Sequence, residues 1–180
     1  TLEYLLERGG PDAKALVWAH NSHIGDARAT EMGRVRGEHN IGQLVRQRWG
    51  DDCALIGFGT HTGTVTAASD WDSDHETKIV LPSRQDSYER ACHDSGVHRF
   101  LLDLAPGRHE TLRRRLAEPL LERFIGVIYR PETERWSHYS EAVLSEQFDA
   151  WVWFDETQAL EPLAAHEPHT GVPDTFPFGL

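Results

Sequence analysis

Two histidines lie three residues apart in the stretch Val17–Gly25, "VWAHNSHIG". An apolar run, Ala15–Ala19, precedes them and has the length and composition of a short strand. Imidazole titrates nearest neutral pH of all side chains, and it can serve as a base, an acid, a hydrogen-bond donor or a metal ligand. In a loop after a strand, the rings of His20 and His23 can turn into one cleft. This placement favours a catalytic or binding role over packing of the pair.

A zinc site is the less favoured interpretation of this pair. The HxxH spacing lacks the embedded glutamate and the helical context of a zincin, and no third ligand is spaced nearby. We therefore expect no bound metal and no cofactor.

The segment that follows the pair, from His20 to His39, is polar and punctuated by glycines, which predicts a long loop. A loop of this length within a compact domain is often functional. Arg28 and Glu31 are the charged residues we expect to bind a substrate beside the histidines. The alternative is a solvated surface loop in which opposite charges pair with one another.

Apolar runs alternate with helical patterns along the chain. A helix is expected over Asn40–Gln47, with Asn40 as its cap and Gly50 as its stop, and another over Ser87–Asp94. Continuously apolar strands between helices are typical of an α/β fold: a largely parallel sheet with helices on both faces. In such a sheet ligands bind beyond the carboxyl ends of strands, which is where the histidine pair falls. The expected strands are Ala15–Ala19, Cys53–Gly59, Phe100–Leu104, Phe124–Tyr129 and Ala150–Phe154, with Thr62–Ala68 pairing back as a hairpin and a further helix over His109–Glu118.

Bulk composition excludes several functions. The 180 residues are 39% hydrophobic and 26% charged, as in one globular domain. The net charge is −11, and because an acidic surface repels phosphate backbones, we expect no nucleic-acid partner. No apolar run approaches the length that crosses a bilayer, so we expect no membrane association. Cys53 and Cys92 form no CxxC site or disulfide framework, which favours the reducing cytoplasm.

Separated motifs follow one another between about Ala15 and Pro162: "VWAHNSHIGDARATEMG", "NIGQLVRQRWG", "GFGTHTGTVTAASDW", "DSYE", "RFLLDL", "IGVIYRPETERWSHY" and "EQFDAWVWFDET". In identity and order they resemble the carboxyl-terminal part of the erythromycin esterase family. The resemblance implies a hydrolase in which a histidine general base activates water to attack an ester or lactone carbonyl. Macrolide lactone opening, and with it macrolide antibiotic resistance, is the named activity, and many members have no assigned substrate.

The resemblance also implies which residues form the site. His20 and His23 match the family's histidine pair in the active-site cleft and are the expected catalytic residues. The family's "SYE"-like and "SHY"-like stretches add Glu89 and His138 as expected substrate-binding residues. The alternatives are a surface carboxylate on a helix for Glu89 and a structural hydrogen bond for His138.

One part of the family's site is not expected in this chain. The proposed general base belongs to an amino-terminal glycine, glutamate and histidine motif, which Gly59–Gly63 matches only in composition. We therefore expect residues 1–162 to be the carboxyl-terminal part of an erythromycin esterase-like domain, a fragment that associates with a missing amino-terminal segment. Residues 163–180 are expected to be a Pro/Gly-rich tail. The expected partner is a small-molecule ester or lactone substrate. The alternatives are a non-catalytic small-molecule or partner-binding domain and a metal-dependent hydrolase.

Overall fold

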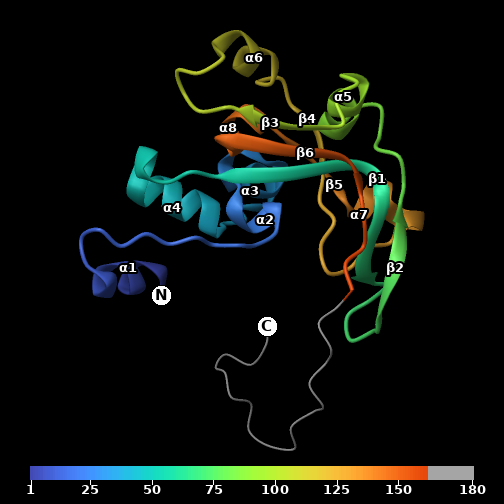
Figure 1. The fold of residues 1–180 in the computed structure, drawn as a ribbon, viewed down its shortest axis with the longest axis horizontal. Coiled ribbons are helices and arrows are strands. Elements are labelled where there is room, and N and C mark those ends of the chain that lie inside the picture. Colours follow the sequence, from blue (N-terminus) through green and yellow to red (C-terminus); the bar gives the residue numbers. More distant parts are fainter. Residues whose placement is uncertain (162–180) are drawn as a thin grey trace, which may run out of the picture.

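The structure, a computed structural model, describes residues 1–161, and a mixed four-stranded sheet forms the centre of this part of the chain (Figure 1). Strands β1 (Ile56–Ala68), β2 (His75–Val80), β3 (Arg99–Asp103) and β6 (Ala150–Thr157) lie in the order β2-β1-β6-β3. β1 and β6 run parallel, whereas β2 pairs antiparallel with β1, and β3 pairs antiparallel with β6. A separate antiparallel pair joins β4 (Leu120–Arg123) to β5 (Tyr139–Ala142).

The prediction of a largely parallel sheet is therefore wrong, although the fold is a mixed α/β fold. The connection from β1 to β2 spans residues 69–74, which is too short for the crossover that parallel neighbours require. Thr62–Ala68 continues β1 and is not the second strand of a hairpin. The apolar runs of β3 and β6 were consistent with either strand direction, because composition does not encode it.

Helices with a clear local signal lie where the sequence predicts them. Asn40 caps α4 by accepting a hydrogen bond from the N–H of Gln43 at 2.9 Å, and Ser87 caps α5 by accepting one from Arg90 at 3.2 Å. No helix within residues 1–161 combines the length and the apolar character needed to cross a membrane. The helices are α1 (Leu2–Gly9), α2 (Asn21–Ile24), α3 (Glu31–Arg36), α4 (Ile41–Trp49), α5 (Tyr88–Asp94), α6 (Glu110–Arg115), α7 (Glu134–Ser137) and α8 (Leu144–Gln147), with 3-10 turns at Ala27–Ala29, Gly50–Asp52 and Pro131–Thr133.

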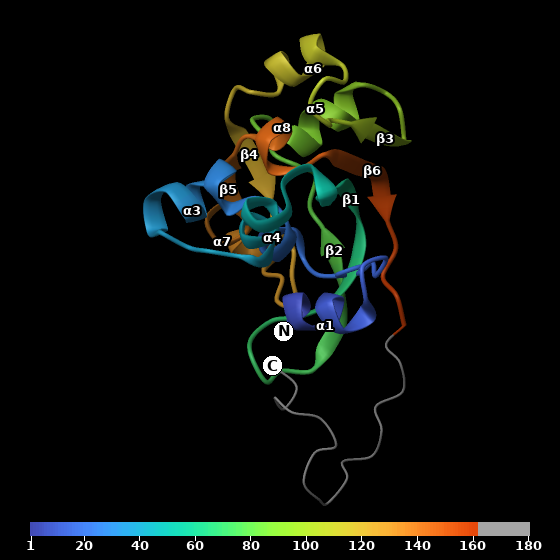
Figure 2. The same cartoon turned by 90° about the vertical axis from the view of Figure 1, so that its left-hand side faces the viewer.

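Two predicted strands and the predicted long loop are wrong. Ala15–Ala19 is extended but joins neither sheet, as the blue segment that leads from α1 toward α2 shows (Figure 1, Figure 2). Phe124–Tyr129 contains no strand, and it meets β1 through one isolated bridge between Ile128 and Ala68. The polar segment from His20 to His39 folds into α2, a 3-10 turn and α3. The predicted tail, residues 163–180, lies outside the described residues.

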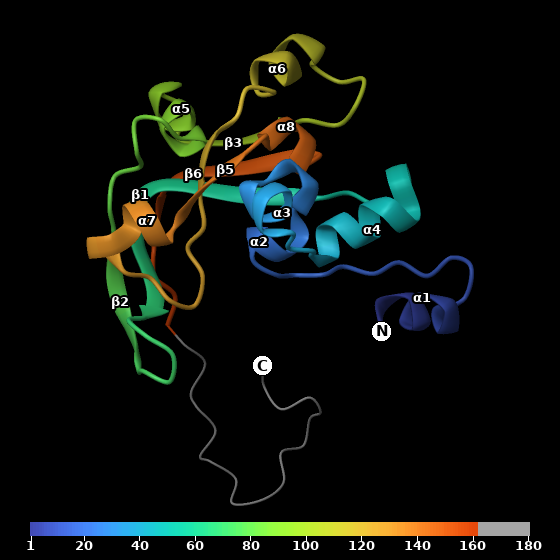
Figure 3. The ribbon, with the colours of Figure 1, turned by 180° about the vertical axis from the view of Figure 1, so that it is seen from behind.

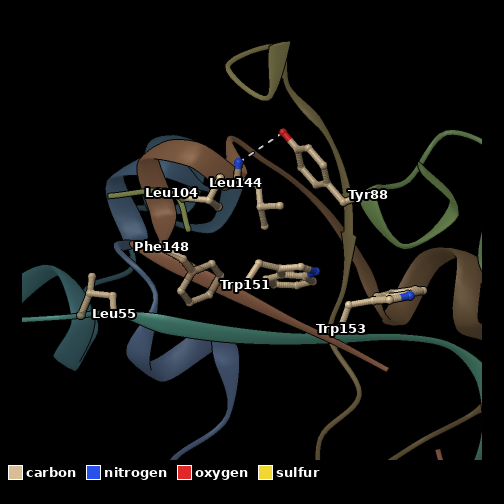
Figure 4. Packing of buried hydrophobic residues seen from close by; sticks show 7 residues of the cluster. All are labelled: Leu55, Tyr88, Leu104, Leu144, Phe148, Trp151 and Trp153. Carbon is tan, nitrogen blue, oxygen red and sulfur yellow. Dashed lines mark hydrogen bonds between the residues drawn. The ribbon is translucent and has the colours of Figure 1, made fainter. Parts of the chain in front are cut away.

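The main hydrophobic core packs against one face of the sheet (Figure 4). Trp151 and Trp153 project from β6 into this cluster and are fully buried. Gly59 of β1 provides the room, since a Cβ there would lie 2.3 Å from the ring of Trp151. Burying side chains of this size contributes roughly 1.5–3 kcal/mol each. The remaining members of the cluster are Leu55, Tyr88, Leu104, Leu144 and Phe148, which come from α5, from α8 and its end, and from the residues that flank β1 and β3.

The opposite face of the sheet is less well covered. Phe58 and Phe154 are each 41% exposed and Leu101 is 65% exposed. The register places Phe58 beside Val152 and Val152 beside Leu101, so the apolar side chains on this face form a row across three strands.

Candidate active site

The two histidines lie at α2, a single helical turn that packs against α4 and β1 (Figure 3). His20 caps the turn: its Nδ1 accepts a hydrogen bond from the N–H of Ser22 at 3.3 Å. His23 lies within the turn and is exposed, and the two ring centroids are 6.3 Å apart at an angle of 72°. The structure therefore brings the two predicted catalytic side chains together. Within residues 1–161, no group of three or more His, Cys, Asp or Glu side chains is placed to hold a metal ion.

The surroundings of His20 favour its neutral form. Burial lowers the pKa of the imidazole, and the neighbouring ring of His23 lowers it further, against a hydrogen bond with the main chain of Ile125. At pH 7 the ring is therefore uncharged. Ser22 engages Nδ1 of this ring twice, with its N–H at 3.3 Å and its Oγ at 2.8 Å.

A cavity of about 1270 Å³ lies beside this turn. Its wall is formed by the amino-terminal segment, α4 and the less covered face of the sheet, and it includes the apolar side chains of Trp18, Phe58 and Ile125. His20 and Glu89 are the predicted site residues that line it. The combination of an apolar wall and a few polar groups is typical of small-molecule sites.

Two carboxyl groups lie buried next to α2. Glu89 of α5 is 1% exposed and Glu122 of β4 is 0% exposed. Oε1 of Glu89 accepts a hydrogen bond from the N–H of Arg123 at 2.8 Å, and Oε1 of Glu122 accepts one from Nδ2 of Asn21 at 3.2 Å. The second oxygen of each carboxyl has no partner among the described residues. Burial raises the pKa of Glu89, and burial together with the charge of Glu89 raises the pKa of Glu122 well above its ordinary value.

Arg123 of β4 supplies the positive charge of this buried layer. Its Nη1 lies 3.0 Å from Oε1 of Glu134 and donates to the main-chain oxygen of Leu81, and its Nη2 donates to the main-chain oxygens of Thr60 and His61. The Arg123 and Glu134 side chains are 1% and 6% exposed. The guanidinium is therefore committed to Glu134 and to the edge of β1.

Arg28 and Glu31 do not line the cavity. The Arg28 side chain is 54% exposed and pairs with Asp26, with Nη2 at 2.6 Å from Oδ2 and Nε at 3.0 Å from Oδ1. Glu31 begins α3 and accepts a hydrogen bond from Ser140 Oγ at 3.4 Å. Arg28 therefore pairs with an acidic neighbour, as the alternative expects, but the Asp26 side chain is only 6% exposed. Substrate binding by Arg28 and Glu31 stays a prediction.

His138 uses both ring nitrogens within the protein. Nδ1 donates to the main-chain oxygen of Phe124 at 3.0 Å, and Nε2 accepts from the N–H of Arg130 at 3.0 Å. Burial lowers the pKa of His138, which favours this neutral form. The ring therefore shapes the loop 124–130, in which the Phe124 ring lies 6.0 Å from that of His20. This is the structural role that the sequence left as the alternative, and a contact with substrate stays a prediction.

A match to a known protein family supports the functional interpretation of this geometry. A family model described as erythromycin esterase matches residues 1–157, most of the chain. The chain belongs to the erythromycin esterase family. The resemblance of the separated motifs is thereby confirmed.

Solved structures of proteins with three different descriptions share this fold. A succinoglycan biosynthesis protein is 23% identical with a TM-score of 0.66 over 87% of this chain, and a Bacillus cereus protein is 17% identical with a TM-score of 0.62 over 79%. A mutant of erythromycin esterase EreC in its open conformation is 21% identical with a TM-score of 0.52 over 86%. These likenesses show a shared fold. The chain spans only 38%, 33% and 35% of those three chains, about a third of their length.

Sequence reasoning missed the buried polar residues in and behind the histidine turn of this member of the erythromycin esterase family. Asn21 stands between the two histidines, and Glu122 and Arg123 interrupt the apolar run "PLLERFIG". Adjacent opposite charges inside an apolar run were the available signal, because such groups are buried only when they have partners. Their partners, however, lie far away along the chain.

Proposed function

We propose that this chain supplies a histidine pair to an active site that hydrolyses a small-molecule ester or lactone. Membership of the erythromycin esterase family supports an esterase-like reaction. The observation that carries the proposal is the position of His20 at the wall of a large, mainly apolar cavity, where burial lowers the pKa of its imidazole. A neutral imidazole near pH 7 can accept a proton or donate its own to a reacting oxygen.

The two rings are proposed to act differently. Nδ1 of His20 lies 3.3 Å from the N–H of Ser22 and 2.8 Å from its Oγ, so Nε2 is the ring nitrogen proposed to face the substrate. It would donate to the oxyanion formed when water attacks the carbonyl, in place of the ring's hydrogen bond with the main chain of Ile125. The exposed ring of His23 is proposed to orient that water for the base. Arg28, Glu31, Glu89 and His138 are proposed to contribute to substrate binding.

We also propose that the family's amino-terminal base motif reaches this site from a segment outside these residues. The solved relatives are about three times as long as the part this chain covers. Leu16, Trp18 and Phe58 are 84%, 82% and 41% exposed around the cavity, and an associating segment would cover them.

The proposed substrate has a bulky apolar body, because the cavity wall is mainly apolar. A macrolide lactone has this character, and its opening would confer macrolide resistance. The cytoplasm is the proposed compartment, since Cys53 and Cys92 are free thiols. The second candidate is binding of such a molecule without turnover, which the tight commitment of Glu89 and His138 to main-chain groups supports.

The test uses the protein as its gene encodes it, assayed with 4-nitrophenyl esters and with a macrolide. His20→Ala and His23→Ala should each lower kcat by roughly 10² to 10⁴ while the melting temperature stays nearly unchanged. His39→Ala is the matched control, since His39 is an exposed histidine whose Nδ1 lies 3.1 Å from the main-chain oxygen of Gly37.

Wild-type kcat in either variant would contradict the catalytic role. Binding of the macrolide by a protein that turns over no ester would favour the non-catalytic alternative. About one zinc per chain by elemental analysis, lost in His20→Ala, would favour metal-dependent hydrolysis.

A further inference from the structure

The turn that carries the histidines cannot hold its own position. α2 comprises the four residues Asn21–Ile24, and an isolated helix of this length is unstable in water. Its place must therefore come from contacts with the rest of the domain. Asn40 supplies one such contact, with Nδ2 donating to the main-chain oxygens of Ser22 at 2.8 Å and Gly25 at 2.7 Å. Asn21 supplies another.

The Asn21 side chain bonds to the edge of the central sheet as another strand would. Its Nδ2 donates to the main-chain oxygen of Phe58 at 2.7 Å, and its Oδ1 accepts from the N–H of Phe58 at 3.1 Å. β2 pairs only with Gly63–Ala68 of β1, so Phe58 lies beyond the end of that partner. The carboxamide of Asn21 thus takes the place of a missing peptide group.

A third hydrogen bond ties the same amide to the buried carboxyl pair. Nδ2 of Asn21 lies 3.2 Å from Oε1 of Glu122, and Asn21 is itself only 8% exposed. Neither Glu122 nor Glu89 is bonded to the Arg123 guanidinium, which is engaged elsewhere. An asparagine at this point therefore gives the carboxyl pair a donor and adds no charge.

We propose that Asn21 is a positioning residue, which sets the orientation of His20 and His23 by clamping α2 between the Phe58 main chain and Glu122. This rests on the proposed catalytic function of the histidines. Asn21 is adjacent to His20 and lies on the turn that bears His23, so any rotation of the turn moves both rings. Asn21 itself would not touch the reacting atoms.

The test compares Asn21→Leu and Asn21→Asp with Tyr129→Phe as the matched control. The hydroxyl of Tyr129 donates to Oε1 of Glu134 at 2.7 Å and accepts from Leu81, so its removal also costs buried hydrogen bonds but leaves α2 untouched. Histidine ring resonances are followed by NMR titration, and kcat and KM are measured on folded protein. Asn21→Leu should lower kcat by about 10²-fold with little change in KM, the effect of a small misplacement of reacting groups. The His20 titration should move toward that of an exposed histidine, and Tyr129→Phe should change neither.

If Asn21→Leu fails to fold, a second pair of variants, Asn21→Asp alone and Asn21→Asp with Glu122→Gln, tests the same contact. Asn21→Asp removes both donated hydrogen bonds and places a carboxylate beside Glu122. Adding Glu122→Gln restores one bond with reversed polarity, and should recover about tenfold in kcat, within the range of measured couplings between contacting residues.

A wild-type His20 titration in folded Asn21→Leu, or no recovery in Asn21→Asp with Glu122→Gln, would overturn the positioning role. The failure of the proposed function looks different. If His20→Ala retains full activity while Asn21→Leu still moves the His20 resonances, the histidines are not catalytic and the clamp stands.

Discussion

Replacing Arg123 by methionine should destabilise the domain more than any exposed charge change. Methionine keeps much of the length and volume of the side chain, so the change isolates the guanidinium. Four contacts disappear: the ion pair with Glu134 at 3.0 Å and the bonds to three main-chain oxygens of Thr60, His61 and Leu81. Glu134 keeps the hydroxyl of Tyr129 at 2.7 Å, but no cation.

The magnitude follows from burial. At 1% and 6% side-chain exposure, water cannot replace the lost partner of Glu134. Breaking a buried pair of this kind costs about 3–5 kcal/mol, most of it the cost of the uncompensated charge. In a domain of this size, a loss of 1 kcal/mol in the free energy of unfolding lowers the melting temperature by about 2–4 °C, so the melting temperature should fall by roughly 6–20 °C.

Urea unfolding monitored by circular dichroism measures this change, with Arg34→Met as the matched control. Arg34 pairs with Glu141 at 2.7 Å, but these side chains are 38% and 50% exposed, so its loss should cost at most about 1 kcal/mol. Combining Arg123→Met with Glu134→Gln should recover part of the stability, because the orphaned charge is removed. The reasoning is refuted if the free energy of unfolding of Arg123→Met lies within about 1 kcal/mol of the wild-type value. It is also refuted if the double variant is less stable than Arg123→Met.

Two further predictions concern the histidine turn and the response to pH. Gly42→Ala should lower the free energy of unfolding in urea by about 1–3 kcal/mol, because the new Cβ would lie 2.3 Å from the main-chain oxygen of Ile24. It should also lower kcat, because α2 is displaced. An unchanged midpoint of the urea transition would show that the turn has room to shift. Burial, and then the ring of His93 stacked at 3.7 Å, lowers the pKa of His61 below 6.5, so the unfolded chain binds more protons below that pH. The stability that His61 contributes is complete above about pH 6.5 and is lost as the pH falls. His61→Gln should therefore have a lower free energy of unfolding than wild type at pH 7.5, and this difference should shrink toward pH 5.5. A difference that grows as the pH falls would contradict the prediction.

Elements with a local signal could be predicted from the sequence. The amide oxygen of Asn40 and the hydroxyl of Ser87 satisfy the first N–H groups of α4 and α5 from one turn away, so the relevant partners are close in the chain. The apolar runs of β3 and β6 mark strands for a similar reason. Ala15–Ala19 shows the limit of that signal, because an apolar run becomes a strand only where an edge of a sheet is available to it.

By itself the sequence determined the family, the α/β class, the cap of α4, the position of α5 and the placement of two histidines on one short segment. Only the tertiary structure decided the direction of the strands, and it alone showed that Glu89 is buried, that His138 is engaged through both ring nitrogens and that Asn21 clamps the turn. The physical reason is the distance along the chain between partners. Asn21 bonds to Phe58 and Glu122, which lie 37 and 101 residues away, and nothing local in "HNSH" encodes which edge of which strand will be left unpaired for it.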